Sequence, residues 1–127
     1  MNIYCGVDMI EIKRIKDSIE KHGKGFIEKI FTPEEINYCE SRREQKYQSY
    51  AARFSAKEAV SKALGTGFSM GVTLKGIEVR VSETGKPYIV LYNETKEFFD
   101  KMGGVSVDIS LTHTSDYATA FAVLLCK

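Results

Sequence analysis

The sequence has few cysteines, almost no net charge and no long apolar run, and each shortage excludes a class of protein. Cys5, Cys39 and Cys126 are an odd number without a CxxC pair, which excludes a disulfide framework and a cysteine-rich zinc site. A net charge of +1 excludes binding of polyanions through overall charge. No apolar run approaches the roughly 20 residues that span a bilayer, and no basic segment opens the chain. We therefore expect free thiols in a reducing, cytoplasmic compartment.

Linkers, repeats and low-complexity segments are also absent, so the 127 residues predict a single domain, 1–127. A short strand is expected over 2–7, ending at Asp8. Helices are expected from about 12 to Gly23, from 32 to about 44, and from about 48 to Gly65. Thr32-Pro33-Glu34-Glu35 predicts the start of the second of these helices, because Thr32 and Glu35 form a capping box around Pro33.

The periodicity changes beyond Gly71. Strand patterns occur at 75–81, 87–92, 105–112 and 117–125, and a short helix is expected at 94–102. Helices gather in the first half and strands in the second. This order predicts an α+β fold in which an antiparallel sheet packs against the helices of the N-terminal half.

The segment 53–65, Arg-Phe-Ser-Ala-Lys-Glu-Ala-Val-Ser-Lys-Ala-Leu-Gly, is the densest in chemical groups. On a helix, Glu58 and Lys62 lie four residues apart and share one face. A surface ion pair between them would explain the spacing, as would a capping box from Ser55 to Glu58. Asp8, taken alone, reads as the N-cap of the first helix. Together, Asp8 and Glu58 would instead offer a hard cation such as Mg²⁺ the two carboxylates that it prefers.

His113 ends a predicted strand at a turn, where a side chain can reach a ligand. A triad of Ser110, His113 and Asp116 is rejected, because these residues share one strand end and lack a nucleophile elbow. Gly65 to Gly67 follow a helix instead of preceding one, so they indicate a helix stop and not a phosphate loop.

Basic residues also recur along the second and third predicted helices. They would form either a solvated helix face or a phosphate-binding ridge of a non-enzymatic nucleotide- or RNA-binding module; they are Arg42, Arg43, Lys46, Arg53 and Lys57. The pI of about 7.7 and the lack of an aromatic stacking motif on a basic sheet count against RNA binding.

Taken together, these segments resemble the holo-acyl-carrier-protein synthase family of phosphopantetheinyl transferases, nearly end to end. The blocks that carry the resemblance occur in the expected order: Gly-Val-Asp at 6–8, Ile-Phe-Thr-Pro-Glu-Glu at 30–35, the segment 53–65, Gly-Lys-Pro-Tyr at 85–88, and Ser-Leu-Thr-His-Thr-Ser-Asp-Tyr-Ala-Thr-Ala at 110–120. The resemblance implies the phosphopantetheinyl transferase fold. It also implies transfer of 4′-phosphopantetheine from coenzyme A to a serine of apo-acyl carrier protein, in fatty acid and lipid metabolism.

The resemblance also implies roles for single residues. Asp8 and Glu58 would bind Mg²⁺ against the pyrophosphate of coenzyme A, and Lys62 would contact phosphate beside them as the third catalytic residue. His113 and Thr114 would line the pocket near the 3′-phosphate, with Gly65 and Pro87 shaping its walls and Arg53 as a further coenzyme A contact. The general base stays unassigned between a water held by the metal and a carboxylate such as Glu58, because position 37, where relatives can have an acid, is Asn37.

The family is homotrimeric and binds coenzyme A in clefts between neighbouring subunits, so the same assembly is expected here. Carrier proteins are acidic, and Lys13, Arg14 and Lys16 on the outer face of the first helix would form a docking strip for one; a solvated helix face is the plainer reading of the same residues. A close alternative is a phosphopantetheinyl transferase for polyketide or peptide synthase carriers. The short chain favours the small trimeric class, because members of the other class are roughly twice as long.

Overall fold

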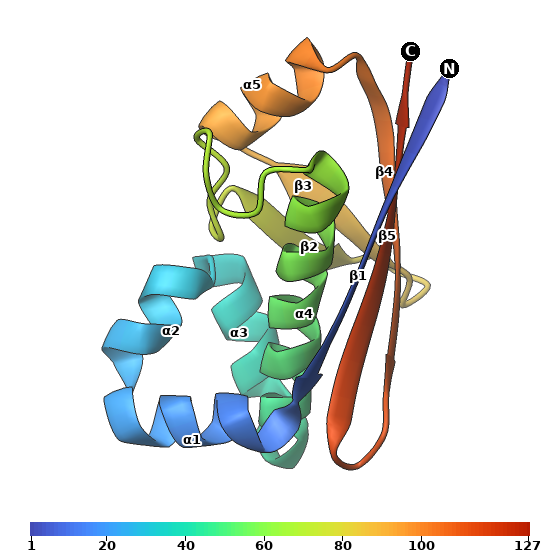
Figure 1. Ribbon diagram of the computed structural model, residues 1–127. Coiled ribbons are helices and arrows are strands. Elements are labelled where there is room, and N and C mark those ends of the chain that lie inside the picture. Colours follow the sequence, from blue (N-terminus) through green and yellow to red (C-terminus); the bar gives the residue numbers. More distant parts are fainter.

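A computed structural model describes all 127 residues, and its central element is the long helix α4 (Figure 1). The elements in chain order are β1 Asn2–Glu11, α1 Ile12–His22, α2 Lys24–Ile30, α3 Pro33–Ser41, the 3-10 turn η1 Arg43–Gln45, α4 Lys46–Leu64, β2 Ile77–Val81, β3 Pro87–Leu91, α5 Asn93–Lys101, β4 Gly104–His113 and β5 Tyr117–Cys126. A three-stranded antiparallel sheet, in the order β1-β5-β4, covers one side of α4. Helices α1 to α3, the antiparallel hairpin β2-β3 and α5 lie on its other sides. The predicted α+β class with antiparallel strands is confirmed.

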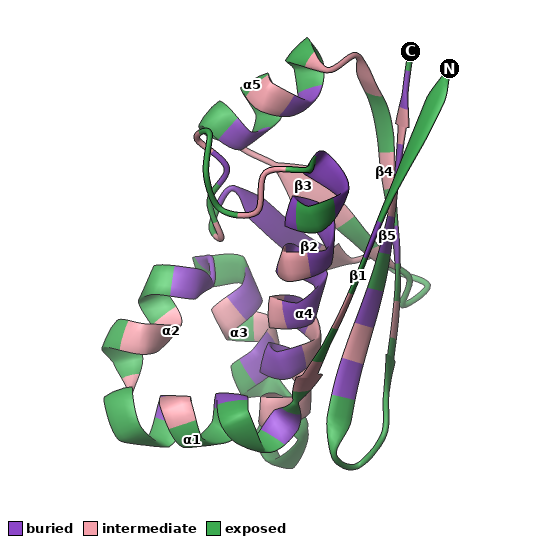
Figure 2. Cartoon of the chain, in the orientation of Figure 1, coloured by how far each residue is buried: buried purple, intermediate pink, exposed green.

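Small side chains allow α4 to pack closely on the sheet. Every second residue of β5 from Ala118 to Cys126 is buried, as expected of a strand with one covered face. From Ala120 onward these residues meet Ala56, Ala59 and Ala63 of α4 in the larger of two apolar clusters. The smaller cluster joins α1, α2, α3 and the first half of α4 through the isoleucines of α1 and Phe31. Figure 2 shows how burial concentrates on α4, while α1 and α2 expose most of their outer faces.

Two predictions at the N-terminal end are wrong. β1 continues to Glu11, because it pairs with β5 from Asn2↔Cys126 to Glu11↔Tyr117, so Asp8 lies inside a strand and not at its end. The N-cap of α1 is therefore Glu11 and not Asp8. A short helix, α2, also follows directly on Gly23, where the sequence predicted only a stop.

The helix signals of the middle segment are confirmed. Thr32 and Glu35 form the reciprocal capping box, with Pro33 in the first turn of α3. Helix α4 ends at Gly65, which has the left-handed conformation (φ 84°) that glycine adopts without strain. Ser55 lies in the interior of α4 and does not cap a helix. None of the helices is both long and apolar enough to cross a membrane.

Candidate active site

The candidate site begins with Gly6, the point where α4 touches the backbone of β1. A Cβ atom at Gly6 would lie 1.9 Å from the carbonyl oxygen of Ala59 and 2.8 Å from the amide nitrogen of Ala63. Only glycine permits this approach. Asp8, two residues further along β1, points to the same side of the strand, so the contact at Gly6 brings its carboxylate against α4.

Both carboxylate oxygens of Asp8 have partners on α4. Oδ1 lies 3.1 Å from Nζ of Lys62, and Oδ2 lies 3.0 Å from Oγ of Ser55. The Lys62 ammonium also donates to the carbonyl oxygen of Val7 at 3.0 Å. The side chain of Asp8 is 15% exposed and that of Lys62 is 52% exposed. Asp8 is therefore mostly buried, while Lys62 extends toward solvent.

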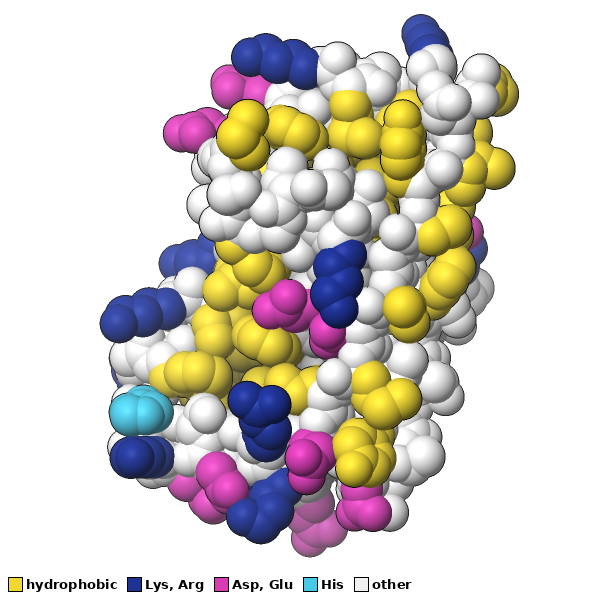
Figure 3. All heavy atoms as spheres, in the orientation of Figure 1, with side chains coloured by type: hydrophobic (Ala, Val, Ile, Leu, Met, Phe, Trp, Pro, Cys, Tyr) yellow, Lys and Arg dark blue, Asp and Glu magenta, His cyan; other side chains and the backbone are white.

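Glu58 completes the group one turn before Lys62 on the same face of α4. Its pKa is raised from the usual value, first by burial and then by the negative charge of Asp8, while Lys62 acts in the opposite direction. Lys62, which pairs with Asp8 at 3.1 Å, lies one turn after Glu58 on α4, so both carboxylates lie on the same side of the helix. Lys62 pairs with Asp8 and not with Glu58, so the prediction of a simple Glu58–Lys62 surface ion pair is wrong. Figure 3 shows acidic and basic side chains meeting at the middle of this face, between apolar areas on either side.

This pair of carboxylates fits Mg²⁺ through its donor chemistry. The chain contains no cluster of three or more histidine, cysteine, aspartate or glutamate side chains able to hold a metal. Mg²⁺ does not require one, because it commonly binds one or two carboxylates and completes its shell with water and substrate phosphate. Asp8 and Glu58 supply two carboxylates beside the half-exposed Lys62.

Arg53 and His113 lie together in a different place. They line a cavity of about 190 Å³ that Arg42 and Tyr38 also border. Arg53 is 4% exposed, its Nε has no hydrogen-bond partner, and its guanidinium carbon lies 4.1 Å from the centre of the Tyr38 ring. Residues five apart on a helix are about 140° apart around its axis, so Arg53 and Glu58 project from different sides of α4. One chain thus holds two separate groups of predicted site residues.

The remaining predicted coenzyme A contacts lie at the ends of elements. The Thr114 hydroxyl accepts hydrogen bonds from the backbone of Asp116 and Tyr117 and closes the turn between β4 and β5. Gly65 is the C-cap of α4, and Pro87 opens β3 opposite Val81.

The basic residues of α1 are exposed but not equivalent. Lys13 forms an ion pair with Asp17 at 2.8 Å, and Lys16 lies 5.6 Å from the centre of the Tyr47 ring. Arg14 is exposed and forms neither an ion pair nor a cation–π contact, so its guanidinium has no charged or aromatic partner within the chain.

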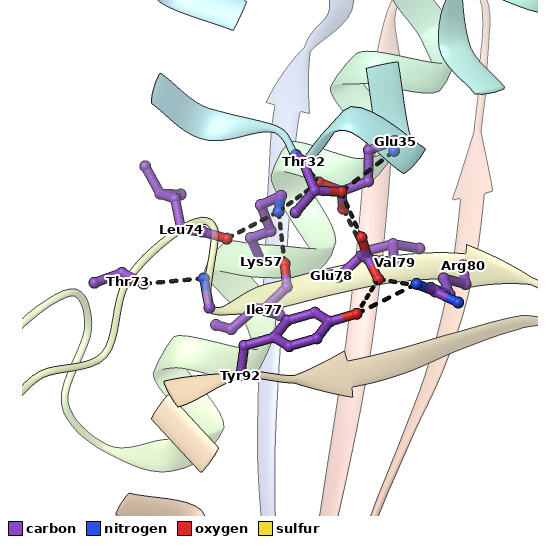
Figure 4. Close-up of polar contacts among 11 residues, drawn as sticks. Thr32, Glu35, Lys57, Thr73, Leu74, Ile77, Glu78, Val79, Arg80 and Tyr92 are labelled. Carbon is purple, nitrogen blue, oxygen red and sulfur yellow. Dashed lines mark hydrogen bonds and ion pairs between the residues drawn. The ribbon is translucent and has the colours of Figure 1, made fainter. Parts of the chain in front are cut away.

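The predicted basic ridge does not exist as a continuous surface, because Arg53 and Lys57 are buried. Lys57 has no exposed side-chain area and pairs with Glu35 at 2.8 Å, in the polar network of Figure 4. Position 57 lies three and seven residues before the buried Val60 and Leu64. This apolar spacing was the available sequence signal that the lysine faces inward.

A second buried carboxylate, Glu78, joins the network. It receives hydrogen bonds from the side chains of Thr32, Arg80 and Tyr92. Burial alone would raise the pKa of Glu78, but these hydrogen bonds outweigh it and lower the pKa. No local pattern singles out Glu78, or Ser55 as a partner of Asp8, since Thr32–Glu78 and Ser55–Asp8 join distant segments.

Comparison with known proteins defines the class. Residues 4–122 match the 4′-phosphopantetheinyl transferase superfamily, and the chain belongs to this family. The relatives are more specific. A holo-[acyl-carrier-protein] synthase of Ruminiclostridium cellulolyticum is 51% identical over 124 residues, which cover 98% of this chain and 92% of the relative.

Solved structures agree with this. The holo-[acyl-carrier-protein] synthase of Neisseria meningitidis superposes with a TM-score of 0.88 at 30% identity, covering 96% of this chain and 97% of the other. The Helicobacter pylori synthase in complex with coenzyme A gives a TM-score of 0.84 at 30% identity, covering 95% and 99%. The resemblance noted from the sequence motifs is thereby confirmed.

Proposed function

We propose that this chain transfers the 4′-phosphopantetheine group from coenzyme A to a serine of apo-acyl carrier protein, in fatty acid biosynthesis. The observation that carries the proposal is the meeting of Asp8, Glu58 and Lys62 where Gly6 lets α4 touch β1. The relatives are synthases of this name, and one was solved with coenzyme A bound. The three free cysteines are consistent with a reducing cytoplasm, the compartment that we propose.

The reaction moves charge onto the pyrophosphate of coenzyme A. The serine oxygen bonds to the β-phosphorus, the bond from this phosphorus to the bridging oxygen breaks, and adenosine 3′,5′-bisphosphate leaves with the bonding electrons. The serine proton passes to a base that remains unassigned. Asp8 and Glu58 would hold Mg²⁺, which when bound stabilises negative charge on the phosphate oxygens. The ammonium of Lys62, whose side chain is 52% exposed, would bind the same phosphates.

Asp8, Glu58 and Lys62 form one group, and Arg53 and His113 form another on a different side of α4. This separation supports a site shared between two subunits of a homotrimer. Asp8, Glu58 and Lys62 would come from one subunit, and Arg53 and His113 from its neighbour. The far face of the sheet also exposes apolar residues that a subunit contact would cover, namely Ile3 (67%), Val7 (55%), Met9 (63%) and Phe121 (43%). A head-to-tail ring repeats one such contact at each boundary.

Mass spectrometry of an apo carrier protein tests the function directly. The carrier is incubated with the chain, coenzyme A and Mg²⁺, and a mass increase of one phosphopantetheine group is expected. Glu58→Gln, which keeps shape but removes the charge that a hard cation requires, should abolish most of this transfer while the fold is retained. Transfer only to a polyketide or peptide synthase carrier would favour the alternative substrate, and no transfer to any carrier would refute the proposal.

Mixing two inactive variants tests the shared site. Asp8→Ala and His113→Ala subunits are unfolded and refolded together, and the trimer is confirmed by sedimentation. Random assembly gives about a quarter of the sites both halves intact, because each half is unmutated about half the time. Activity near a quarter of wild type is expected, whereas mixed trimers as inactive as their parents would place both residues in one chain's pocket.

A further inference from the structure

Ser55, a buried residue of α4, contacts the Asp8 carboxylate of β1. Its side chain is fully buried, and its Oγ lies 3.0 Å from Oδ2 of Asp8 and 3.0 Å from the Asp8 carbonyl oxygen. We propose that Ser55 is the positioning residue of Asp8, fixing the carboxylate in the orientation that a divalent cation requires. This inference rests on the proposed function, because it takes Asp8 and Glu58 as the metal ligands.

Because of this hydrogen bond, the two carboxylate oxygens of Asp8 have different partners. A serine hydroxyl has one hydrogen to donate, and a donor to an ionised carboxylate makes a shorter and stronger bond than one to a neutral group. Oδ2 is therefore held from the protein interior, while Oδ1 faces Lys62 at the open side. A carboxylate held at one oxygen loses freedom to rotate, so the hydrogen bond from Ser55 would keep the other oxygen, Oδ1, on the side of Lys62.

The direction of this hydrogen bond is unusual for a serine inside a helix. Such serines commonly bond a carbonyl oxygen one turn earlier in their own helix. Ser61 does so in the same helix, with its Oγ 2.7 Å from the carbonyl oxygen of Glu58. Ser55 instead reaches across to β1, 47 residues away in sequence. Both serines are buried in α4, but only Ser55 binds Asp8. Ser61 is therefore the matched control for Ser55.

The contact at Gly6 explains why a hydroxyl as short as serine's can reach the strand. Ser55 lies one turn before Ala59, whose carbonyl oxygen the missing Cβ of Gly6 would meet. With the two backbones so close, one carbon atom and one oxygen span the gap. Replacing Ser55 by alanine removes the hydrogen bond and creates only a very small cavity, so the variant should fold.

The test measures metal affinity without any catalysis. Mn²⁺ serves as the probe, and free Mn²⁺ is titrated by electron paramagnetic resonance against wild type, Ser55→Ala and Ser61→Ala, first alone and then with coenzyme A. Removing an outer partner of a metal ligand typically weakens affinity 10–100-fold. We expect a loss of about tenfold or more for Ser55→Ala and less than about twofold for Ser61→Ala. Urea unfolding of all three proteins accompanies the titrations.

Each outcome decides the proposal. Equal Mn²⁺ affinity in wild type and Ser55→Ala overturns it, and so does an equal loss in both serine variants, which would reflect general loosening of α4. Failure of wild type to bind Mn²⁺, alone or with coenzyme A, also overturns it. The carrier-protein assay is read separately: selective loss of Mn²⁺ affinity in Ser55→Ala without any carrier transfer by wild type upholds the role of Ser55 and refutes the proposed function.

Discussion

Replacing Lys57 by methionine should lower the free energy of unfolding by about 3–5 kcal/mol, the usual effect of removing one partner from a buried ion pair. Neither Lys57 nor Glu35 has exposed side-chain area, and Nζ lies 2.8 Å from Glu35 Oε1. The same ammonium donates to the carbonyl oxygens of Leu74 at 2.8 Å and Ile77 at 2.5 Å. Methionine is flexible and fills a similar volume. The change therefore removes a charge and a donor while largely preserving packing.

The loss arises because the Glu35 carboxylate is left buried without its cation. Burial lowers the pKa of Lys57, and the charge of Glu35 acts against this shift. The buried ammonium therefore depends on Glu35 to stay charged. Glu35 also accepts hydrogen bonds from the backbone of Thr32 at 2.9 Å and Val79 at 2.7 Å. Glutamine at position 35 would keep an acceptor for one of them without a charge. Lys57→Met combined with Glu35→Gln should therefore recover part of the lost stability.

Urea unfolding followed by far-ultraviolet circular dichroism measures these differences. Lys62→Met is the control, because it changes the same residue type in the same helix at a side chain that is 52% exposed; its effect should stay within about 1 kcal/mol. A loss for Lys57→Met no larger than for Lys62→Met would refute the reasoning. A double variant no more stable than Lys57→Met would show that the uncompensated charge is not the cause.

Three further predictions concern the site and its surroundings. Gly6→Ala should prevent stable folding, as measured by circular dichroism, because its Cβ would meet the Ala59 carbonyl oxygen. Gly25→Ala in α2, where the position has open space around it, should instead raise the free energy of unfolding by about 0.5–1 kcal/mol. A well-folded Gly6→Ala variant would contradict the close contact. Arg14→Glu should raise KM for the carrier protein more than KM for coenzyme A, with a smaller defect at high salt, while Lys101→Glu on the distant α5 should not; equal, salt-insensitive penalties would make the basic strip of α1 a solvated face. Arg53 lines the same cavity as His113, the residue expected near the 3′-phosphate of coenzyme A. Arg53→Ala should therefore raise KM for coenzyme A while leaving KM for dephospho-coenzyme A nearly unchanged, because only the former carries this phosphate; an equal rise for both would contradict this role of Arg53.

Local signals in the sequence predicted most of the elements. The capping box of Thr32 and Glu35, the left-handed stop at Gly65 and the alternation along β4 and β5 each depend on residues close together in the chain. At a helix end, for example, backbone N–H and C=O groups lack partners in the helix, and residues close in sequence supply them. They also placed Glu58 and Lys62 on one helix face.

What the sequence could not predict depends on distant partners. Asp8 seemed to end a strand, because nothing near it announces that β1 continues beside β5 as far as Glu11. Lys57 seemed to be a surface charge, because its partner Glu35 lies on another helix. The apolar spacing around position 57 favoured an inward direction, but a charged residue predicts exposure unless its counterion is known, and Glu35 lies 22 residues away in the sequence. Ser55 was missed for the same reason.

The pairing of the first strand with the last has a consequence for synthesis of the protein. β1 carries Asp8 and has a single neighbour in the sheet, β5, which spans residues 117–126. While the ribosome translates the intervening segments, β1 has no strand to pair with. Glu58 and Lys62 of α4 are therefore synthesised before the strand that holds Asp8 can join the sheet. Asp8 is among the first residues to be translated, yet its strand can pair only after Tyr117 to Cys126 have been translated. Asp8 and Glu58 are thus brought together after nearly everything else in the chain has been translated.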